Sequence, residues 1–404
     1  MIDLSQLFSI QDNLLKQVPR DFKRFLYGKI NWKNRLIGLI GGRGTGKTTL
    51  LLQHLAEAGP GSPNYLYISA DHIRVEALGI YEIASRFFQM GGEVIVIDEI
   101  HKYDGWPQEI KNLYDAFPKA HILFSGSSSL GLQLGKADLS RRAVFYNLTG
   151  LSFREYLYLS EEIEFPIIEF KDLLREHSSF SSDIVAEGPV LRHFQNYIDH
   201  GIYPFFMEGT EEYSEKLSNI IEKVLYEDIA STSGMKSMNV PILKRIIWLV
   251  ATSSPFKPNF EKISKNLGIS RPSLYIYLDY LEKSGLLSGV MAQGAGAKLA
   301  RKPARIYLDN TNLLRAVSGE LSREDPVGTI RETFVQHQLD SAGFQLRIPE
   351  KGDFLIENEY LFEVGGRSKG KDQITNKKNA YILKDDIDIG FGNVIPMWLI
   401  GFLY

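Results

Sequence analysis

The chain contains no cysteine among its 404 residues. This absence excludes disulfide bonds, zinc sites built on thiolates and a cysteine nucleophile, and it fits a reducing compartment. Long hydrophobic runs are also missing, since no apolar stretch approaches the ~20 residues that a membrane-spanning helix needs. The segment Met1–Ile10 lacks the basic start and long apolar core of a signal peptide. We therefore expect a cytoplasmic protein without a membrane span.

An excess of one charge is absent as well. Lys and Arg number 46 against 49 Asp and Glu, which gives a formal net charge of −3. This balance excludes a globally basic nucleic-acid binder but leaves room for a local basic patch. The length predicts two to four domains, and the 44% hydrophobic and 24% charged fractions are typical of a globular protein. The 20 Tyr and 23 Phe indicate substantial hydrophobic cores.

The most informative stretch is RLIGLIGGRGTGKTTL at Arg35–Leu50, where an apolar run meets a glycine-rich turn and a helical pattern follows. It matches G-x-x-x-x-G-K-[ST] in the strand–turn–helix context that this phosphate-binding motif requires. Glycines let consecutive N–H groups point at phosphate, and the following helix adds the positive end of its dipole. Lys47 is expected to reach the β- and γ-phosphates, and the Thr48 hydroxyl to ligate Mg²⁺. The alternative is a glycine-rich turn between a strand and a helix that binds no ligand. The predicted nucleotide-binding residues are Gly41, Gly42, Arg43, Gly44, Thr45, Gly46, Lys47, Thr48 and Thr49.

The stretch Gly91–Glu99 is a short apolar strand that ends in two carboxylates. An uninterrupted apolar run suits a central parallel strand that is buried on both faces. Ligands bind at the carboxyl ends of strands in open α/β sheets, so Asp98 should lie beside the phosphate loop and hold Mg²⁺. Glu99 is then the candidate base that orients the attacking water. Taken alone, these acids would be a solvated strand end; the preceding motif favours the catalytic interpretation.

Strands and helices alternate over Arg35–Gly150, which predicts a parallel α/β sheet with right-handed crossovers. After the fourth strand, Ser127 would contact the γ-phosphate or the attacking water, or it would cap a helix. Asp71 closes the second strand, either near the site or as a simple turn residue. The expected helices begin at Thr48 and lie around Ala77–Met90, Pro107–Phe117 and Ser128–Leu134. The expected strands are Arg35–Ile40, Asn64–Ser69, Glu93–Ile97, His121–Ser125 and Ala143–Leu148.

Four stretches together resemble a bacterial and archaeal family of AAA+-type ATPases. They are Gly41–Thr48, VIVIDEIH at Val94–His101, SGSSSL at Ser125–Leu130 and LSRR…LTGLSFREYL at Leu139–Leu157. The resemblance covers most of the chain and implies ATP as the nucleotide. It also implies a C-terminal half of poorly known function, with a winged helix and a domain similar to the PD-(D/E)xK nucleases.

Arg141 and Arg142 precede the fifth expected strand. AAA+ proteins often place an arginine there that reaches the γ-phosphate of the neighbouring subunit. Such a residue offsets transition-state charge and can raise the rate by ~10³–10⁵. The resemblance therefore implies a homo-oligomer with one of these arginines at the shared site, and the family pattern favours Arg141. The alternative is a pair of surface residues that brace the strand.

The chain divides by pattern into five segments. We expect an N-terminal helical segment at 1–34, the ATPase domain at 35–158, a helical linker region at 159–250, a winged helix–turn–helix at 251–310 and a nuclease-like domain at 311–404. The basic end of the first segment would be a solvated helix face packed beside the ATPase core, or an edge that faces nucleotide or DNA.

The linker region contains two stretches that resemble family signatures. Its beginning, Ser160–Ser182, is interpreted as a variable connection, and a helical pattern runs from Asp183 to Val250. In the stretch HGIYP, Gly201 ends one helix and Pro204 starts the next. The stretch LYEDI at Leu225–Ile229 has no assigned chemistry, and its Asp228 is expected to be a surface carboxylate.

A helix–turn–helix is predicted at Asn259–Val290, with helices at Phe260–Leu267 and Arg271–Ser284. Ser270 suits the N-cap of the second helix, and Gly289–Leu308 would form the wing. In a winged helix the second helix enters a major groove and basic residues contact phosphates, so duplex DNA is one possible partner and a protein client is the other. The residues predicted to contact DNA are Arg271, Lys298, Arg301, Lys302 and Arg305.

The last segment has the order helix, strands, helix, strands, and Val394–Tyr404 is expected to be a buried strand. Asp353 and Glu363 lie on two strands joined by a short turn, as the metal-binding acids of the PD-(D/E)xK core do. Glu332 lies on the preceding helix. Gly365 occupies the position at which that core has a lysine. A degenerate domain that does not cleave nucleic acid is therefore expected, although cleavage with another lysine stays open.

The sequence thus predicts an α/β P-loop ATPase of the AAA+ type, followed by a helical segment, a winged helix and a small α+β nuclease-like domain. ATP binding and hydrolysis with Mg²⁺ would be coupled to a C-terminal module that recognises DNA or protein. The alternatives are a non-hydrolysing nucleotide switch that docks a protein partner, and an ATP-dependent nuclease.

Overall fold

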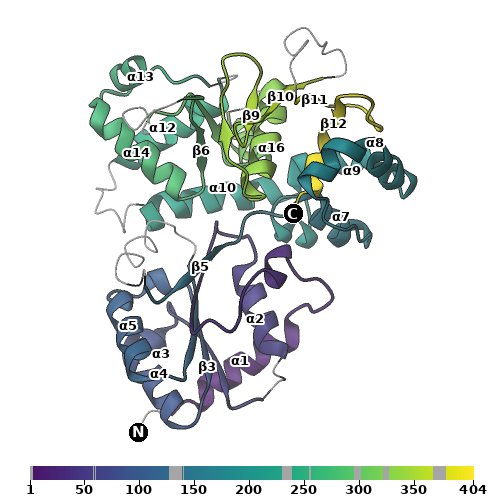
Figure 1. Ribbon diagram of the computed structural model, residues 1–404. Helices are drawn as coiled ribbons and strands as arrows, with labels where there is room; N and C mark the ends of the chain where they lie inside the picture. Colours follow the sequence, from purple (N-terminus) through teal and green to yellow (C-terminus); the bar gives the residue numbers. More distant parts are fainter. Residues whose placement is uncertain are drawn as a thin grey trace. The chain divides into compact units, whose positions relative to one another are not determined.

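The computed structural model shows a chain that divides into two compact units, each with its own five-stranded sheet (Figure 1). The first unit comprises Met1–Thr149 and Glu227–Met235, and the second comprises Gly150–Tyr226 and Lys236–Tyr404. The division into five segments stays a prediction. The structure describes residues 3–57, 59, 61–126, 139, 141–229, 239–253, 256–294, 302–321, 327–366 and 379–404.

The sheet of the first unit is entirely parallel, with the order β2-β3-β4-β1-β5. Both ends of every strand lie within one residue of the predicted bounds, so the predicted parallel α/β sheet is confirmed. Strand β4 separates β1 from β3, and the ends of these three strands meet at one edge. The strands are β1 (Leu36–Ile40), β2 (Tyr65–Ser69), β3 (Val94–Asp98), β4 (His121–Gly126) and β5 (Val144–Asn147).

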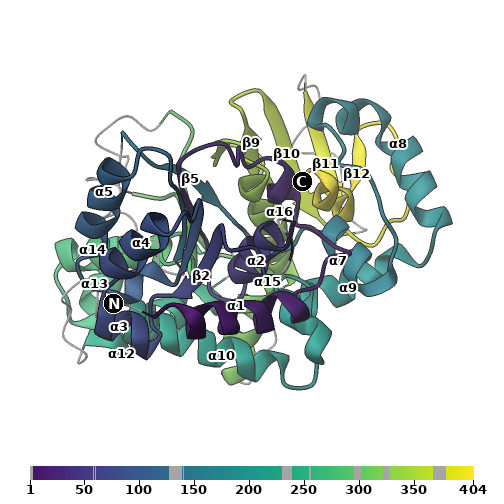
Figure 2. The same cartoon turned by 90° about the horizontal axis from the view of Figure 1, so that it is seen from below.

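Helices cover both faces of this sheet. Helix α2 lies on one face, and α3, α4 and α5 lie on the other (Figures 1 and 2). Helix α1 lies against β2 and packs into the cores on both faces. The predicted helix around Ala77–Met90 is instead two helices that meet at Gly79, whose φ is 86°. Only part of the first 34 residues is helical. The helices are α1 (Ser5–Gln17), α2 (Lys47–Glu57), α3 (Ile73–Leu78), α4 (Ile80–Gln89), α5 (Trp106–Ala116) and the 3₁₀ turns η1 (Phe25–Gly28) and η2 (Ile100–Lys102).

The two layers explain why β3 is apolar throughout. Side chains alternate along a strand, so Ile95 and Ile97 pack toward α4 and α5 while Val96 packs toward α2. All three are fully buried. The apolar run therefore ends where the sheet ends, and Asp98 is the first polar residue at the edge.

The sheet of the second unit has the order β12-β11-β10-β9-β8 and is mixed. Strands β10, β11 and β12 pair in parallel, whereas β9 pairs antiparallel with β10 and β8. A separate antiparallel pair joins β6 and β7. The strands are β6 (Leu287–Val290), β7 (Arg305–Leu308), β8 (Leu346–Arg347), β9 (Phe354–Ile356), β10 (Tyr360–Gly365), β11 (Ala380–Lys384) and β12 (Val394–Pro396).

Helices make up most of the remaining described part of this unit. Helix α7 begins with a capping box formed by Ser152 and Glu155. None of the helices in the described part of the chain is long and apolar enough to cross a membrane. The helices are α7 (Phe153–Glu161), α8 (Phe170–Ala186), α9 (Val190–His200), η3 (Pro204–Glu208), α10 (Tyr213–Lys223), α12 (Val240–Ala251), α13 (Phe260–Leu267), α14 (Arg271–Lys283), α15 (Thr311–Glu320), α16 (Val327–Ser341) and η6 (Met397–Phe402). The π-helix η4 (Val224–Ile229) begins in this unit, and its residues from Glu227 onward belong to the first unit.

Two predictions about this unit are wrong. Ser160–Ser182 is not a variable connection, because α8 already begins at Phe170 and buries Leu173, Leu174 and His177 at helical spacing. Its serine-rich solvent face hides that pattern. The end of the chain, Val394–Tyr404, is buried as predicted but is mainly the 3₁₀ helix η6 after the short strand β12.

The predicted helix–turn–helix elements are present. Ser270 accepts a hydrogen bond from the Ser273 N–H at 3.1 Å and caps α14, and Gly268, with a φ of 66°, ends α13. Strands β6 and β7 follow where the wing is expected. The assignment of these elements to a winged helix stays a prediction. The second predicted helix of the last segment lies outside the described residues.

Candidate nucleotide-binding site

The loop between β1 and α2 needs its glycines. A Cβ on Gly41 would lie 2.2 Å from the backbone oxygen of Leu148, closer than real contacts allow. Gly44 and Gly46 have φ values of 79° and 93°, in the region that other residues rarely adopt. The glycines therefore make possible a tight loop that leads into the N-terminus of α2, which is the arrangement that binds phosphate.

Lys47 is buried inside this loop, with 5% of its surface exposed. Its ammonium donates to the carbonyl oxygens of Gly41 at 3.1 Å and Gly42 at 2.8 Å. Burial lowers the pKa of Lys47, and the nearby carboxylates Glu99 and Asp98 act in the opposite direction. The carbonyl groups are neutral acceptors, so a phosphate oxygen could replace them with a stronger, charge-assisted hydrogen bond.

Asp98, at the end of β3, accepts hydrogen bonds from three hydroxyl groups. Thr48 Oγ1 donates to Oδ2 at 2.6 Å, Tyr67 OH donates to the same oxygen at 2.9 Å, and Ser125 Oγ donates to Oδ1. These donors come from α2, β2 and β4, which meet at this edge of the sheet. The structure thus brings together Thr48 and Asp98, the two residues predicted to hold Mg²⁺, and adds Tyr67 and Ser125.

The donor set at Asp98 fits Mg²⁺. The ion prefers oxygen ligands and is commonly bound by one or two protein groups together with substrate phosphates and water. The Thr48 hydroxyl and an Asp98 carboxylate oxygen are adjacent, and both are ligands of this kind. Among the described residues, no three or more His, Cys, Asp or Glu side chains are gathered to hold a metal ion. A site of this type does not need such a cluster, because the nucleotide supplies the remaining charge.

Glu99 has a strained backbone at the candidate base position. Its φ of 51° and ψ of 36° are left-handed, which is uncommon for a residue with a side chain. The Glu99 N–H donates to Ser125 Oγ at 3.2 Å, which helps to hold this turn. Its carboxylate is partly exposed and lies 3.7 Å from His101 Nε2. Such strain persists where the surroundings impose it, and it is common at functional sites.

Asp228 corrects the prediction of a surface carboxylate. Only 2% of the residue is exposed, and its carboxylate accepts two hydrogen bonds from the guanidinium of Arg43, at 3.0 Å from Nε and 2.7 Å from Nη2. His101 Nε2 lies 3.7 Å from Asp228 Oδ1. Burial alone would raise the pKa of Asp228, but hydrogen bonds from His101 and Arg43 outweigh it and hold the pKa at about 2. Asp228 is therefore an ionised group at the phosphate loop, contributed from 185 residues further along the chain.

Arg24 is a second residue that the sequence did not assign to the loop. It is buried, and its guanidinium donates to the carbonyl oxygen of Thr45 at 2.7 Å and to that of Thr149 at 2.8 Å. It thus ties the phosphate loop to the end of β5. Arg24 belongs to the basic end of the N-terminal segment, and no local pattern marks it as a residue that braces the loop.

The two candidate arginine fingers differ in their surroundings. Arg142 makes a bidentate ion pair with Asp115, at 3.1 Å and 3.0 Å. Arg141 is exposed at the surface of the first unit. The third predicted catalytic residue outside the motifs, Ser127, lies outside the described residues. Asp71 is exposed and accepts a hydrogen bond from Ser69, as a turn residue does.

In the second unit, the predicted acids share an arginine. Arg305 Nη1 donates to Glu332 Oε2 at 2.6 Å and lies 3.4 Å from Asp353 Oδ1. Tyr307 OH also donates to Glu332, at 2.8 Å. Burial raises the pKa of Glu332. Glu363, on β10, is fully buried. Arg305 was predicted to contact DNA, and this is wrong because it is buried between carboxylates.

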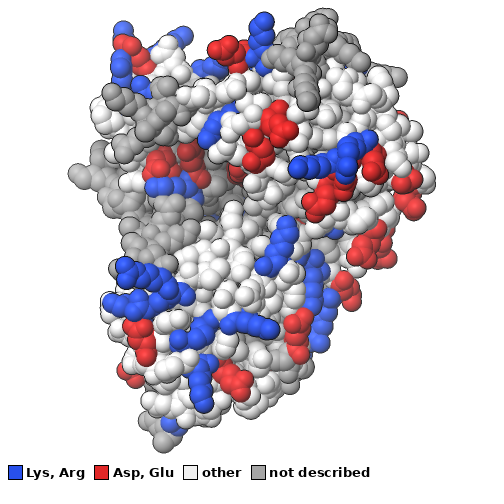
Figure 3. Space-filling view, in the orientation of Figure 1, with Lys and Arg blue, Asp and Glu red and all other residues white. Residues whose placement is uncertain are grey.

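The other residues predicted to contact DNA are placed less decisively. Arg271 is exposed and pairs with Glu261 at 2.8 Å, and Lys302 is exposed. Lys298 and Arg301 lie outside the described residues. On the face shown in Figure 3, basic and acidic side chains are interspersed over both units.

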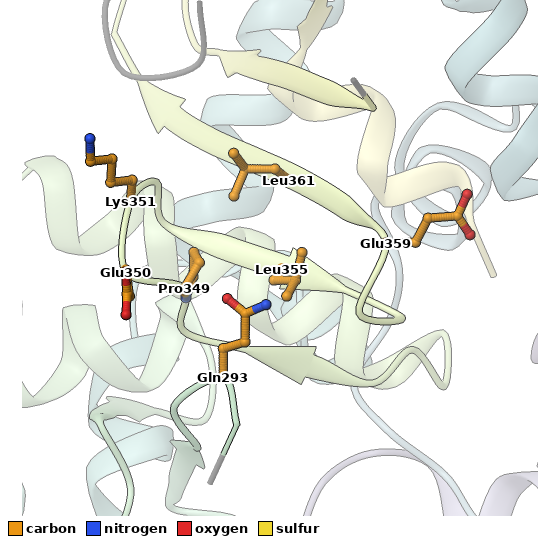
Figure 4. Close-up of a pocket in the computed structure, with 7 residues that line it drawn as sticks. All are labelled: Gln293, Pro349, Glu350, Lys351, Leu355, Glu359 and Leu361. Carbon is orange, nitrogen blue, oxygen red and sulfur yellow. The ribbon is translucent and has the colours of Figure 1, made fainter. Parts of the chain in front are cut away.

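A recess of about 420 Å³ lies on the sheet of the second unit (Figure 4). Leu355 of β9 and Leu361 of β10, which pair in register, line it together with the charged Glu350 and Lys351. Neither Asp353 nor Glu363 lines the recess, so it is separate from the predicted nuclease-like acids.

Comparisons with known proteins agree with this geometry in the first unit. Residues 33–157 match the family described as AAA domain, and residues 191–324 match a domain of unknown function (DUF8612). Together with the parallel sheet and the loop between β1 and α2, the first match identifies residues 33–157 as an AAA-type P-loop domain.

The whole chain is also similar to known proteins. It is 26% identical over 432 residues to the uncharacterized protein MJ1637 of Methanocaldococcus jannaschii, an alignment that covers 96% of this chain and 91% of that protein. Its structure is similar to the Walker-type ATPase paby2304 of Pyrococcus abyssi, with a TM-score of 0.41 and 11% identity over 78% of this chain and 96% of that one. It is also similar to AMPPCP-bound DnaA from Aquifex aeolicus, with a TM-score of 0.24 and 15% identity over 69% of this chain and 88% of that one.

Proposed function

We propose that this protein is a Mg²⁺-dependent ATPase. Phosphoryl transfer to water requires positioning and charge neutralisation rather than a covalent nucleophile. The loop amides and Lys47 would hold the phosphates, Thr48 and Asp98 would hold Mg²⁺, and Glu99 would orient the attacking water. The observation that carries the proposal is the 2.6 Å contact between Thr48 and Asp98, which brings the phosphate loop and the end of β3 together.

The second unit would be the module that nucleotide state controls. It contains the helix–turn–helix elements α13 and α14, which suit recognition of duplex DNA or of a protein client. Nuclease activity is disfavoured, because Arg305 already pairs with Glu332 and Asp353 and because Gly365 occupies the position of the expected lysine. The unit is then a recognition domain that does not cut.

A homo-oligomer would complete the active site. Arg141 is the favoured finger, because Arg142 is already bound to Asp115 whereas Arg141 is exposed. An arginine supplied by a neighbouring subunit makes activity depend on assembly.

The test is steady-state ATP hydrolysis against protein concentration, with and without duplex DNA, for the wild type and for Glu99→Gln. We expect specific activity to rise with concentration, and turnover in Glu99→Gln to fall by about 10²–10⁴ while nucleotide binding persists, as for loss of a general base. Unchanged turnover in Glu99→Gln would refute the base assignment. Nucleotide binding without turnover at any concentration would instead favour a switch that docks a protein partner.

A further inference from the structure

One turn of helix contacts both loops of the nucleotide site. Asp228 on η4 binds Arg43 of the phosphate loop through two hydrogen bonds and lies near His101. Its neighbour Glu227 accepts hydrogen bonds from Arg43 at 3.1 Å and from Lys102 at 2.8 Å. His101 and Lys102 belong to η2, the turn that follows Glu99. The two acids of η4 therefore link the phosphate loop to the turn that carries the candidate base.

The imidazole of His101 lies between two carboxylates. Its Nε2 is 3.7 Å from Asp228 Oδ1 and 3.7 Å from Glu99 Oε2, and its side chain is only 3% exposed. The buried imidazole of His101 can fix the orientation of Glu99. It can do so only if the orientation of the His101 ring is itself fixed. Both carboxylates lie near the same ring nitrogen, so the ionised Asp228 can limit the orientations in which the His101 ring meets Glu99.

The helix that supplies these acids has an unusual form and origin. Helix η4 is a π-helix. This form is rare in proteins overall, and where it occurs it is often found at functional sites. In the chain, Glu227–Met235 belongs to the first unit, but the residues on either side, Tyr226 and Lys236, belong to the second. A change in the position of η4 therefore occurs where the chain passes between the two units.

The form of the Arg43–Asp228 pair argues against a role in stability alone. Burying an ion pair is weak evidence of stabilisation, because desolvation offsets the attraction between the charges. A bidentate arginine pair does fix geometry, however, because the planar fork accepts one orientation of the carboxylate. Arg43 lies three residues from Gly46 in the loop that wraps phosphate, so fixing Arg43 fixes that loop.

We propose that Asp228 is a positioning residue of the nucleotide site, acting on the phosphate loop through Arg43 and on Glu99 through His101. It is also the contact through which η4 senses bound nucleotide. This inference rests on the proposed ATPase function. The hydrogen bonds of Lys47 and Thr48 do not involve Asp228, so nucleotide should still bind while Glu99 and Arg43 lose their alignment.

The experiment compares Asp228→Asn, Arg43→Gln, His101→Gln and the double variant Arg43→Gln/Asp228→Asn. We expect each single variant to lower kcat by about 10- to 100-fold, a loss of the size caused by small misplacement of catalytic groups, with a less than threefold change in the Kd for ATP. The double variant should lose no more than the worse single variant, because its two residues act as a unit. It also leaves no unpaired charge, so it keeps the test valid if Asp228→Asn alone does not fold.

The matched control is Glu57→Gln, which removes one carboxylate from an exposed ion pair with Lys23 in the same unit. Its kcat should equal that of the wild type. If Asp228→Asn and Arg43→Gln keep wild-type kcat, or if their losses multiply in the double variant, the positioning role is wrong while the ATPase function stands.

A second readout separates the failure of this inference from failure of the proposed function. If the wild type binds nucleotide without turnover, hydrolysis fails, and hydrogen exchange at Val224–Ile229 is measured with and without a non-hydrolysable ATP analogue. We then expect a nucleotide-dependent change in protection that Arg43→Gln abolishes. Equal protection with and without the analogue would overturn the sensing role, and absence of nucleotide binding would overturn both proposals.

Discussion

Carboxylates are gathered in both units, but their hydrogen-bond partners differ. In the first unit, Asp98 accepts hydrogen bonds from the hydroxyls of Thr48, Tyr67 and Ser125. In the second, Asp353 and Glu332 share the guanidinium of Arg305. A hydroxyl is neutral and can remain beside the carboxylate when a cation arrives, whereas a buried guanidinium already supplies the positive charge.

The comparison teaches that the type of acid does not by itself define a metal site. Hydroxyl donors do not cancel the negative charge of an Asp, so the carboxylate can still attract Mg²⁺ with its phosphates. An Asp and a Glu that share an arginine already have a cation between them, and a metal would have to displace that arginine. The first arrangement suits the binding of a metal ion, and the second suits stabilisation of the fold.

The contrast between the two units requires that the first unit binds nucleotide through Lys47. We expect Lys47→Ala to weaken ATP binding by about 1,000-fold, because charge-assisted hydrogen bonds to two phosphates are lost. Titration with a fluorescent ATP analogue measures the change. Lys23→Ala, which removes an exposed lysine that pairs with Glu57, serves as the control and should bind normally. A loss of less than tenfold in Lys47→Ala would contradict the assignment.

The structural role of Arg305 is the next test. Arg305→Met should lower the free energy of unfolding by about 3 kcal/mol, because it leaves Glu332 and Asp353 without their cation. Arg271→Met, at the exposed pair with Glu261, should change it by no more than about 0.5 kcal/mol. Urea unfolding of the second unit gives both values. Metal-dependent cleavage of DNA by the wild type, lost in Asp353→Ala, would show instead that the acids bind metal despite Arg305.

Acid should weaken the contact of Asp228 with the phosphate loop. The pKa of Asp228 in the folded chain, about 2, lies below its ordinary value of 3.8. Its contribution to stability is therefore present above pH 4 and is lost as the pH falls toward 2, by about 2 kcal/mol. The free energy of unfolding should be higher for the wild type than for Asp228→Asn at pH 6. This difference should become smaller as the pH is lowered to 2. A difference that does not vary with pH would contradict the ionised, paired state.

The smallest expected effect concerns the hydroxyl donors to Asp98. Tyr67→Phe removes the hydrogen bond at 2.9 Å and should raise the Mg²⁺ concentration for half-maximal ATPase activity by about fivefold. Tyr65→Phe, on the same strand, should leave that concentration unchanged. An unchanged Mg²⁺ requirement in Tyr67→Phe would show that its hydroxyl does not orient Asp98.

The parts of the fold that local pattern controls could be predicted from the sequence. The strands β1 to β4 alternate with helices, and the phosphate loop is a single continuous motif. The buried contacts of Arg43 and Arg305 could not be predicted, because their partners lie 185 and 27 residues away. Nothing in the neighbourhood of an arginine reveals which distant carboxylate it will meet. The signature LYEDI did mark Asp228, but only folding brings its partner to it.

The split composition of the first unit also bears on how the protein is made. Arg43 leaves the ribosome 185 residues before Asp228, and the intervening chain includes residues 150–226 of the other unit. At typical synthesis rates this interval is about 10–40 s. During that time the phosphate loop exists without the acid that holds its arginine, so the nucleotide site is completed only after Gly150–Tyr226 of the second unit has been made. A chain cut short before Asp228 would then carry the nucleotide-binding motif in an unfinished site, which links full activity to complete translation.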